Sequence, residues 1–136
     1  NETFVGVPGQ GATLNGKAIE TRKTTTLDQA SVYINEPDGI RRDHPALFQR
    51  LWTIGGSCRA AYDCYPHALV AAGQIDICID FGLQPYDYLP LIGLIEAAGG
   101  VMTDWDGNAL TMESEGHVVA AATPELLAEI LPHLRR

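Results

Sequence analysis

The sequence predicts an α/β fold: a mixed, largely parallel sheet with helices on both faces, preceded by a short β-hairpin. Three observations support this prediction. Short apolar runs typical of strands alternate with segments at helical spacing over residues 31–136, which favours a sheet with crossover helices. The apolar share of 46% and the charged share of 19% are those of a globular chain. A length of 136 residues fits one unit of ordinary size.

Residues 1–30 are expected to form a β-hairpin and a connection, separate from the α/β domain of residues 31–136. Asn15-Gly16 is a strong signal for a two-residue hairpin turn between short β-like runs. The connection that follows, residues 22–30, is polar and rich in threonine. The chain lacks an initiator methionine and opens on a strand-like run. We therefore expect residues 1–30 to be a remnant of a larger N-terminal sheet domain.

Strands and helices alternate through the rest of the chain. The expected strands cover residues 31–35, 58–62, 76–80, 101–104 and 117–122. The expected helices cover residues 44–53, 64–72, 86–98 and 124–134.

Local signals set the bounds of these elements. Leu47, Phe48 and Leu51 fall at helical spacing. Before them, Pro37-Asp38-Gly39 has the composition of a turn and is expected to be one. Thr123 is the predicted N-cap of the last helix, because a proline at the first helical position follows it.

The junction of a strand and a long apolar helix at residues 80–90 is the strongest candidate for a functional site. Asp80 ends the strand, and Asp87 lies at or just inside the helix start. The free N–H groups and positive dipole end there favour a carboxylate, and equally a phosphate or a cation held by a carboxylate. If Asp87 is the N-cap, Pro90 falls in the first turn, where backbone N–H groups make no helical hydrogen bond, so the missing N–H of proline costs nothing there. From spacing alone, a simple capping role for Asp87 is the alternative to metal binding.

The run Pro-Tyr-Asp-Tyr-Leu-Pro-Leu-Ile at 85–92 is followed at 95–107 by Ile-Glu-Ala-Ala-Gly-Gly-Val-Met-Thr-Asp-Trp-Asp-Gly. Together they resemble the C-terminal signature of the inositol monophosphatase superfamily, and most closely that of its histidinol-phosphatase-like members. The resemblance extends from about Phe4 to about Leu131. It implies the C-terminal portion of a Mg²⁺-dependent phosphatase that hydrolyses a small phosphate monoester, either histidinol phosphate or inositol monophosphate.

The resemblance also implies roles for five residues. Asp87 matches the aspartate that the C-terminal half contributes to the metal ions. Asp80 matches a position where the family commonly has a glutamate that contacts the organic part of the substrate; a solvated acid at a strand end is the alternative. Ala61, Tyr62 and Asp63 stand where histidinol-phosphatase-like members carry Gly-Gly-Asp, which implies substrate binding, with side chains in place of two glycines near the ligand. No catalytic residue is assigned within this chain.

The family's other metal ligands, a glutamate and an Asp-Pro-x-Asp-Gly-Thr motif, belong to the N-terminal half, and the motif is absent here. Residues 36–39, Glu-Pro-Asp-Gly, resemble it only superficially. The expected partners are therefore the missing N-terminal half of the same protein and a small phosphorylated substrate, with a homodimer as a further expected assembly. The chain alone is expected to be inactive. The alternative function is a non-catalytic domain that keeps the fold and binds a ligand or partner.

Composition excludes several other classes. A net charge of -8, with basic pairs only at Arg22-Lys23 and Arg41-Arg42, argues against a nucleic-acid surface. No apolar run approaches the roughly 20 residues that span a bilayer, and no signal peptide opens the chain, so no membrane is expected. The resemblance implies that the run containing Asp104 and Asp106 is a structural turn, so these two acids are expected outside the metal site, with metal binding as the alternative. Three cysteines without Cys-x-x-Cys spacing indicate reduced thiols and a cytoplasmic protein: Cys58, Cys64 and Cys78.

Overall fold

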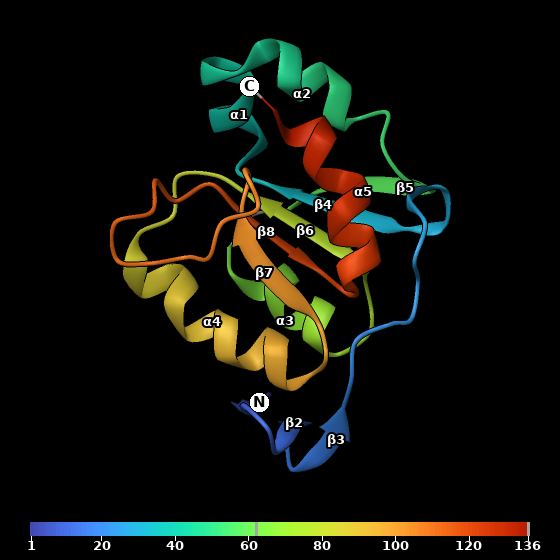
Figure 1. Cartoon of the computed structure of the whole chain (residues 1–136), viewed down its shortest axis with the longest axis vertical. Helices are drawn as coiled ribbons and strands as arrows, with labels where there is room; N and C mark the ends of the chain where they lie inside the picture. The colour runs from blue at the N-terminus through green and yellow to red at the C-terminus, as the bar shows by residue number, and fades with distance from the viewer. Residues whose placement is uncertain (62, 136) are drawn as a thin grey trace.

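A five-stranded sheet forms the centre of the computed structural model, which describes residues 1–61 and 63–135 (Figure 1). The strand order is β5-β4-β6-β8-β7. β4 pairs in parallel with β5 and β6, whereas β8 pairs antiparallel with β6 and β7. Only β8 therefore runs against the others, which confirms a mixed, largely parallel sheet. The strands are β4 Ser31–Asn35, β5 Ser57–Ala61, β6 Ile77–Asp80, β7 Val101–Asp104 and β8 Val118–Ala121.

Helices cover both faces of this sheet, as predicted (Figure 1). One face carries α1 Pro37–Asp43, α2 Pro45–Leu51 and α5 Pro124–Leu134, and the other carries α3 Tyr65–Ala71 and α4 Pro85–Ala97. Alternation along the strands supplies both cores, because successive side chains point to opposite faces. In β6, Ile77 and Ile79 pack with the first group of helices, and Cys78 between them packs with the second.

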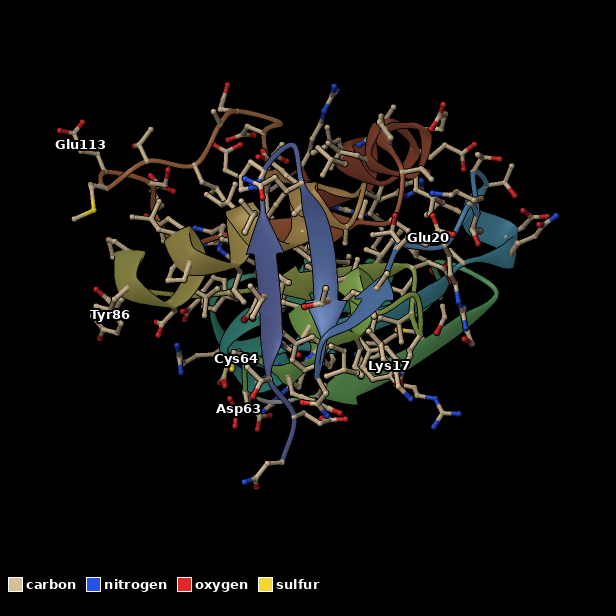
Figure 2. All side chains as sticks on the ribbon, turned by 90° about the horizontal axis from the view of Figure 1, so that it is seen from below. Lys17, Glu20, Asp63, Cys64, Tyr86 and Glu113 are labelled. Carbon is tan, nitrogen blue, oxygen red and sulfur yellow. The ribbon has the colours of Figure 1, made fainter. Side chains whose placement is uncertain are left out.

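A second, small antiparallel sheet lies outside α4. It contains β1 Phe4–Val7, β2 Gly11–Leu14 and β3 Lys17–Ile19. Asn15 and Gly16 both have left-handed φ values, 50° and 77°, which confirms the predicted hairpin turn. Figure 2 shows the outer face of this sheet uncovered, and Val5 and Val7 on β1 are 49% and 40% exposed. Its origin as the remnant of a larger sheet stays a prediction.

The sheet approaches α4 closely at a glycine. A Cβ atom on Gly6 would lie 2.5 Å from the Cα atom of Leu94. Any side chain at this position of β1 would therefore push the small sheet away from the helix. The connection to β4 includes a short 3₁₀ helix, Leu27–Gln29, that the sequence did not predict.

The turn predicted at Pro37-Asp38-Gly39 is wrong: these residues form the first turn of α1. Proline at the first helical position has its φ angle already set for a helix, and Ile40 is fully buried one residue later. Gly39 is needed for packing, because a Cβ atom there would lie 2.9 Å from the ring of Phe81. Helix starts and turns share this composition, so the burial of Ile40 decides between them.

Asp87 lies just inside the start of α4, as expected, but it is not the N-cap, which was the condition for placing Pro90 in the first turn. Gln84 is the N-cap of α4, and Asp87 is the third helical residue of a capping box. The Asp87 carboxylate accepts a hydrogen bond from the Gln84 backbone N–H at 2.8 Å. Pro90 is consequently inside the helix and not in its first turn. Because Pro90 has no N–H, the backbone carbonyl of Tyr86 lacks its helical hydrogen bond. Tyr86 is 76% exposed.

The last helix follows its prediction closely. α5 spans Pro124–Leu134, and the Thr123 hydroxyl accepts a hydrogen bond from the Leu126 N–H at 3.2 Å. This confirms Thr123 as the N-cap. Within the part of the chain that the structure describes, none of the helices has both the length and the apolar character needed to cross a membrane.

Candidate metal and substrate site

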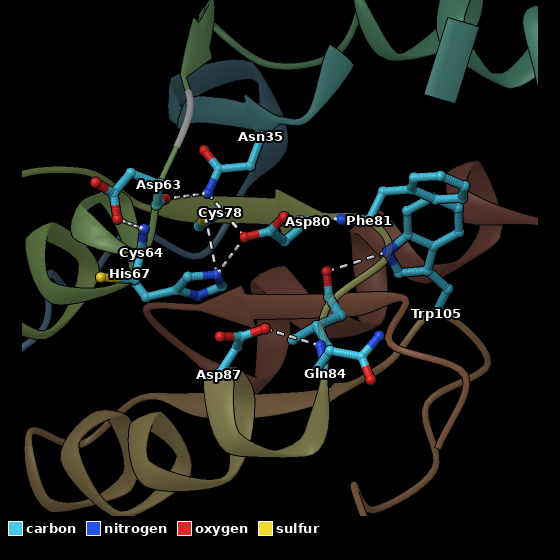
Figure 3. A network of polar contacts seen from close by, with 11 residues as sticks. Asn35, Asp63, Cys64, His67, Cys78, Asp80, Phe81, Gln84, Asp87 and Trp105 are labelled. Carbon is cyan, nitrogen blue, oxygen red and sulfur yellow. Dashed lines mark hydrogen bonds and ion pairs between the residues drawn. The ribbon is translucent and has the colours of Figure 1, made fainter. Parts of the chain in front are cut away.

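The candidate site lies where the three parallel strands end. The carboxyl ends of β5, β4 and β6 meet at one edge of the sheet, which is where open α/β sheets bind ligands. The N-terminus of α4 faces this edge, so Asp87 lies opposite Asp80 (Figure 3). A cavity of about 230 Å³ opens between them, lined by Glu36, Asp63, Cys64, Asp80, Leu83 and Asp87.

Three of the predicted site residues, Asp63, Asp80 and Asp87, therefore come together around one cavity. Ala61 is the last residue of β5, two positions before Asp63, and is not among the residues that line the cavity. Tyr62 lies outside the described residues.

Asp80 is buried, and its carboxylate accepts three hydrogen bonds. It is 2% exposed. Its Oδ2 accepts bonds from Asn35 Nδ2 at 2.8 Å and from His67 Nε2 at 2.9 Å. Its Oδ1 accepts a bond from the Phe81 backbone N–H at 2.8 Å. The alternative of a solvated strand-end acid does not hold, because these three donors fix the carboxylate at the wall of the cavity.

Asp63 is exposed and has a left-handed backbone, with φ at 77°. Its carboxylate accepts a hydrogen bond from the Cys64 backbone N–H at 2.6 Å, and this bond lowers the pKa of Asp63. Its own carbonyl oxygen accepts a bond from Asn35 Nδ2 at 2.8 Å. Asp63 therefore offers an ionised carboxylate at neutral pH on a loop anchored through its backbone.

Asp87 is half-buried and uses one carboxylate oxygen in the capping box. The same carboxylate can face a cation with its other oxygen. Its field reaches the far side of the cavity: burial, then Asp63, then Asp87 raise the pKa of the Cys64 thiol. Asp63, Cys64 and Asp87 thus share one electrostatic environment.

Glu36 belongs to the site and was missed from the sequence. It follows β4 directly, with φ at 48°, a left-handed conformation that is strained for a glutamate. Its side chain does not cap α1. The sequence does place Glu36 directly after an apolar strand. That position points to the site only if the strand is known to lie between two other parallel strands, which requires the strand order. In the sequence, residues 36–39 were compared only with the family's Asp-Pro-x-Asp-Gly-Thr motif, so Glu36 was not considered as a site residue.

The cavity is strongly acidic. Four of its lining residues are carboxylates, and none of those that the structure describes is basic. Like charges this close raise each other's cost of ionisation unless a cation lies among them. Carboxylate oxygens are preferred ligands of Mg²⁺, which also retains water ligands. The site is therefore suited to a divalent cation, an ammonium group, or both.

A second group of potential ligands lies behind Asp80. The ligand atoms of His67, Cys78 and Asp80 all lie within 4.8 Å of one another, and all three residues are buried. Hydrogen bonds to His67 and Asn35 already occupy Asp80 Oδ2. Burial, with a contribution from Asp80, raises the pKa of the Cys78 thiol well above its ordinary value, and metal binding needs the thiolate. We assign this group a supporting role behind Asp80.

Asp104 is the last residue of β7, and Asp106 lies in the turn that follows it. The Asp104 carboxylate accepts hydrogen bonds from the backbone N–H groups of Asp106 and Asn108 and from the Asn108 side chain. Neither Asp104 nor Asp106 lines the cavity with Asp87.

The comparisons with known proteins identify the family of the chain. The model of the inositol monophosphatase family matches residues 1–136. The chain is 36% identical over 121 residues to Bifunctional phosphatase IMPL2, chloroplastic, of Arabidopsis thaliana, covering 89% of this chain and 35% of that protein. It is 29% identical to Histidinol-phosphatase of Chlorobaculum parvum, covering 88% of this chain and 46% of that protein. It is 30% identical to Nus factor SuhB of Pseudomonas aeruginosa, covering 98% of this chain and 52% of that protein.

Among solved structures, the inositol monophosphatase from Zymomonas mobilis superposes with a TM-score of 0.91 at 30% identity, covering 98% of this chain and 53% of that chain. The chain thus spans about half the length, or less, of the curated relatives it matches. Because the family model covers every residue, the chain belongs to the inositol monophosphatase family.

Proposed function

We propose that this chain is the C-terminal part of a Mg²⁺-dependent phosphatase that hydrolyses a small phosphate monoester, with histidinol phosphate favoured over inositol monophosphate. Relatives in the family are phosphatases. The observation that carries the proposal is the acidic cavity, in which Glu36, Asp63, Asp80 and Asp87 surround about 230 Å³ without a basic side chain among the described lining residues.

Asp87 is the proposed metal ligand. It is held at a helix start by the Gln84 N–H, which leaves an oxygen for a cation. One or two carboxylates with water and substrate oxygens suffice for Mg²⁺. The ion would polarise the phosphoryl group and lower the pKa of a bound water. Within this chain, Asp87 would bind and orient the ion. Further metal ligands are expected from the N-terminal half.

Asp63 is the proposed contact for a substrate amine. It is exposed, ionised and anchored by its own backbone. Hydrogen bonds to a charged group contribute about 1.5 to 3 kcal/mol, against about 0.5 to 1.5 for neutral ones. The ammonium group of histidinol phosphate gains this difference, and the hydroxyls of inositol do not. Asp80 is the second acid proposed to face the amine, and Ala61 and Tyr62 remain proposed neighbours of the ligand.

The other contributors are also proposals. We place the missing metal ligands on an N-terminal half of the same protein. We propose that the whole protein is cytoplasmic, and we expect the isolated chain to be inactive. A homodimer is compatible with this arrangement. The rival function, a non-catalytic domain that binds a partner, is supported by the relative called Nus factor SuhB. The net charge of -8 still argues against direct contact with nucleic acid.

NMR on the 136-residue chain separates these functions. Mn²⁺ is added as a paramagnetic substitute for Mg²⁺, and histidinol and myo-inositol serve as phosphate-free probes. Mn²⁺ should broaden the amide signals of Asp87, Gln84 and Cys64, and histidinol should shift those of Asp63 and Cys64 more than myo-inositol does. Asp87→Asn should remove the broadening, and the control Glu125→Gln, another acid in a first helical turn, should not.

Two results would overturn the proposal. Broadening that survives Asp87→Asn would remove Asp87 from the metal site. Equal shifts with histidinol and myo-inositol would remove the preference for an aminated substrate. Binding of neither Mn²⁺ nor histidinol would favour the partner-binding domain.

A further inference from the structure

We infer that Asn35 is a positioning residue that holds Asp63 and Asp80 as one unit, although it does not line the cavity itself. The inference rests on the proposed substrate-binding function of Asp63. It predicts that affinity for an aminated ligand depends on a residue that never touches the ligand.

The sheet topology places Asn35 between the two acids. Asn35 ends β4, the strand between β5 and β6. It pairs in register with Ala61 of β5, two residues before Asp63. On the other side, Ile34 pairs with Ile79 of β6, one residue before Asp80. A side chain at the end of the middle strand can therefore reach both neighbours.

One amide nitrogen makes both connections. Asn35 Nδ2 donates to the Asp63 carbonyl oxygen and to Asp80 Oδ2, each at 2.8 Å (Figure 3). An amide nitrogen carries two hydrogens, so each bond has its own donor. The two acids that we propose to attract the amine are thus tied through a single planar group.

The surroundings fix the orientation of this amide. Asn35 is 1% exposed, and no hydrogen-bond partner for its Oδ1 is present within residues 1–61 and 63–135. Turning the amide over would place Oδ1 against the Asp63 carbonyl and the Asp80 carboxylate, both of which are acceptors. Both bonds would then be replaced by repulsion, so only the observed orientation is stable.

Asp63 depends on Asn35 more than Asp80 does. Asp80 keeps its bonds from His67 and from the Phe81 N–H if Asn35 is removed. Asp63 has a left-handed backbone, which persists only when the surroundings hold it. Its carbonyl would lose the Asn35 donor. Loss of Asn35 should therefore release the Asp63 loop while leaving Asp80 and Asp87 in place.

Histidinol affinity of the 136-residue chain, measured by NMR titration, tests the inference. Asn35→Ala and Asp63→Asn should each weaken binding by about tenfold, equivalent to about 1.4 kcal/mol. The double variant should be no weaker than Asp63→Asn alone, because residues that act as one unit are not additive. Mn²⁺ broadening at Asp87 should stay unchanged in Asn35→Ala. Asn35→Ser, with a single hydroxyl donor, should serve one acceptor and give an intermediate loss.

Thr21→Ala is the matched control. Thr21 is 2% exposed, and its hydroxyl donates to the Ala122 carbonyl at 2.8 Å, at the opposite end of the sheet. It should lose a comparable buried hydrogen bond and keep its histidinol affinity. A second readout needs no ligand: hydrogen exchange of the Cys64 amide, which donates to Asp63, should accelerate in Asn35→Ala and in Asn35→Ser but not in Thr21→Ala.

The outcomes separate this inference from the proposed function. Additive losses in the double variant, or a loss no larger than that of Thr21→Ala, would reduce Asn35 to a residue that supports stability alone. If the wild-type chain binds no histidinol, the proposed substrate is wrong, and the exchange experiment decides on Asn35 by itself. Unchanged Cys64 exchange in both Asn35 variants would overturn the inference. If Asn35→Ala fails to fold, Asn35→Ser provides the same comparisons.

Discussion

Replacing Asp87 should separate its capping role from its metal role. The Asp87 carboxylate accepts the Gln84 N–H at 2.8 Å, and an asparagine oxygen can accept the same bond. Asp87→Asn loses only the charge at the helix dipole, about 0.3 to 1 kcal/mol. Relief of repulsion from the other three acids of the cavity opposes this loss. Asp87→Ala also loses the hydrogen bond from the Gln84 N–H, a further cost of about 0.5 to 1.5 kcal/mol.

Thermal unfolding with and without Mg²⁺ is the assay. At a Mg²⁺ concentration ten times its Kd, binding to the folded state adds about 1.4 kcal/mol. For a chain of this size that raises the Tm by about 3 to 5 °C. Wild type and Glu125→Gln should show the rise, and neither Asp87 variant should. An equal rise in Asp87→Asn would refute the reasoning, since Asp87 would then be a capping residue only.

Three further predictions follow from the geometry of the loops. Burial, Asp63 and Asp87 raise the pKa of the Cys64 thiol. Because the thiolate is the reactive form, Asp63→Asn or added Mg²⁺ should speed alkylation of Cys64 by iodoacetamide at pH 8. Unchanged alkylation rates, measured by mass spectrometry, would contradict this. The Cys64 N–H lowers the pKa of Asp63, so the loss of histidinol affinity at acid pH should come at a lower pH than an ordinary aspartate would give. Asp63→Asn should show no such loss in a pH titration. Gly116→Ala should cost about 3 kcal/mol in denaturant unfolding, because its Cβ would lie 2.0 Å from the Leu83 carbonyl at a φ of +79°; a loss below about 1 kcal/mol would show that the loop adapts.

Much of the fold could be predicted from local patterns. The run of β6 reads as a strand buried on both faces because Ile77, Cys78 and Ile79 are all apolar, and helices do cover both faces. The errors arose where one composition serves two structures. Pro37-Asp38-Gly39 fits a turn or a helix start, and the burial of Ile40 selects the helix.

The site was predicted only in part. The resemblance supplied Asp63, Asp80 and Asp87, and the structure brings them to one cavity. Glu36 and Asn35 were missed because their positions acquire meaning only when β4 is known to lie between β5 and β6. Strand order depends on long-range pairing, which a single sequence read along its length does not contain.

Phosphate release from histidinol phosphate tests the central claim most directly. The measurement compares the 136-residue chain with a longer protein in which a family N-terminal half precedes it, each with and without Mg²⁺. We predict Mg²⁺-dependent release by the longer protein, faster with histidinol phosphate than with inositol monophosphate and abolished by Asp87→Asn, and no release by the chain alone. Mg²⁺-dependent release by the isolated chain, or undiminished release by the Asp87→Asn protein, would contradict the claim.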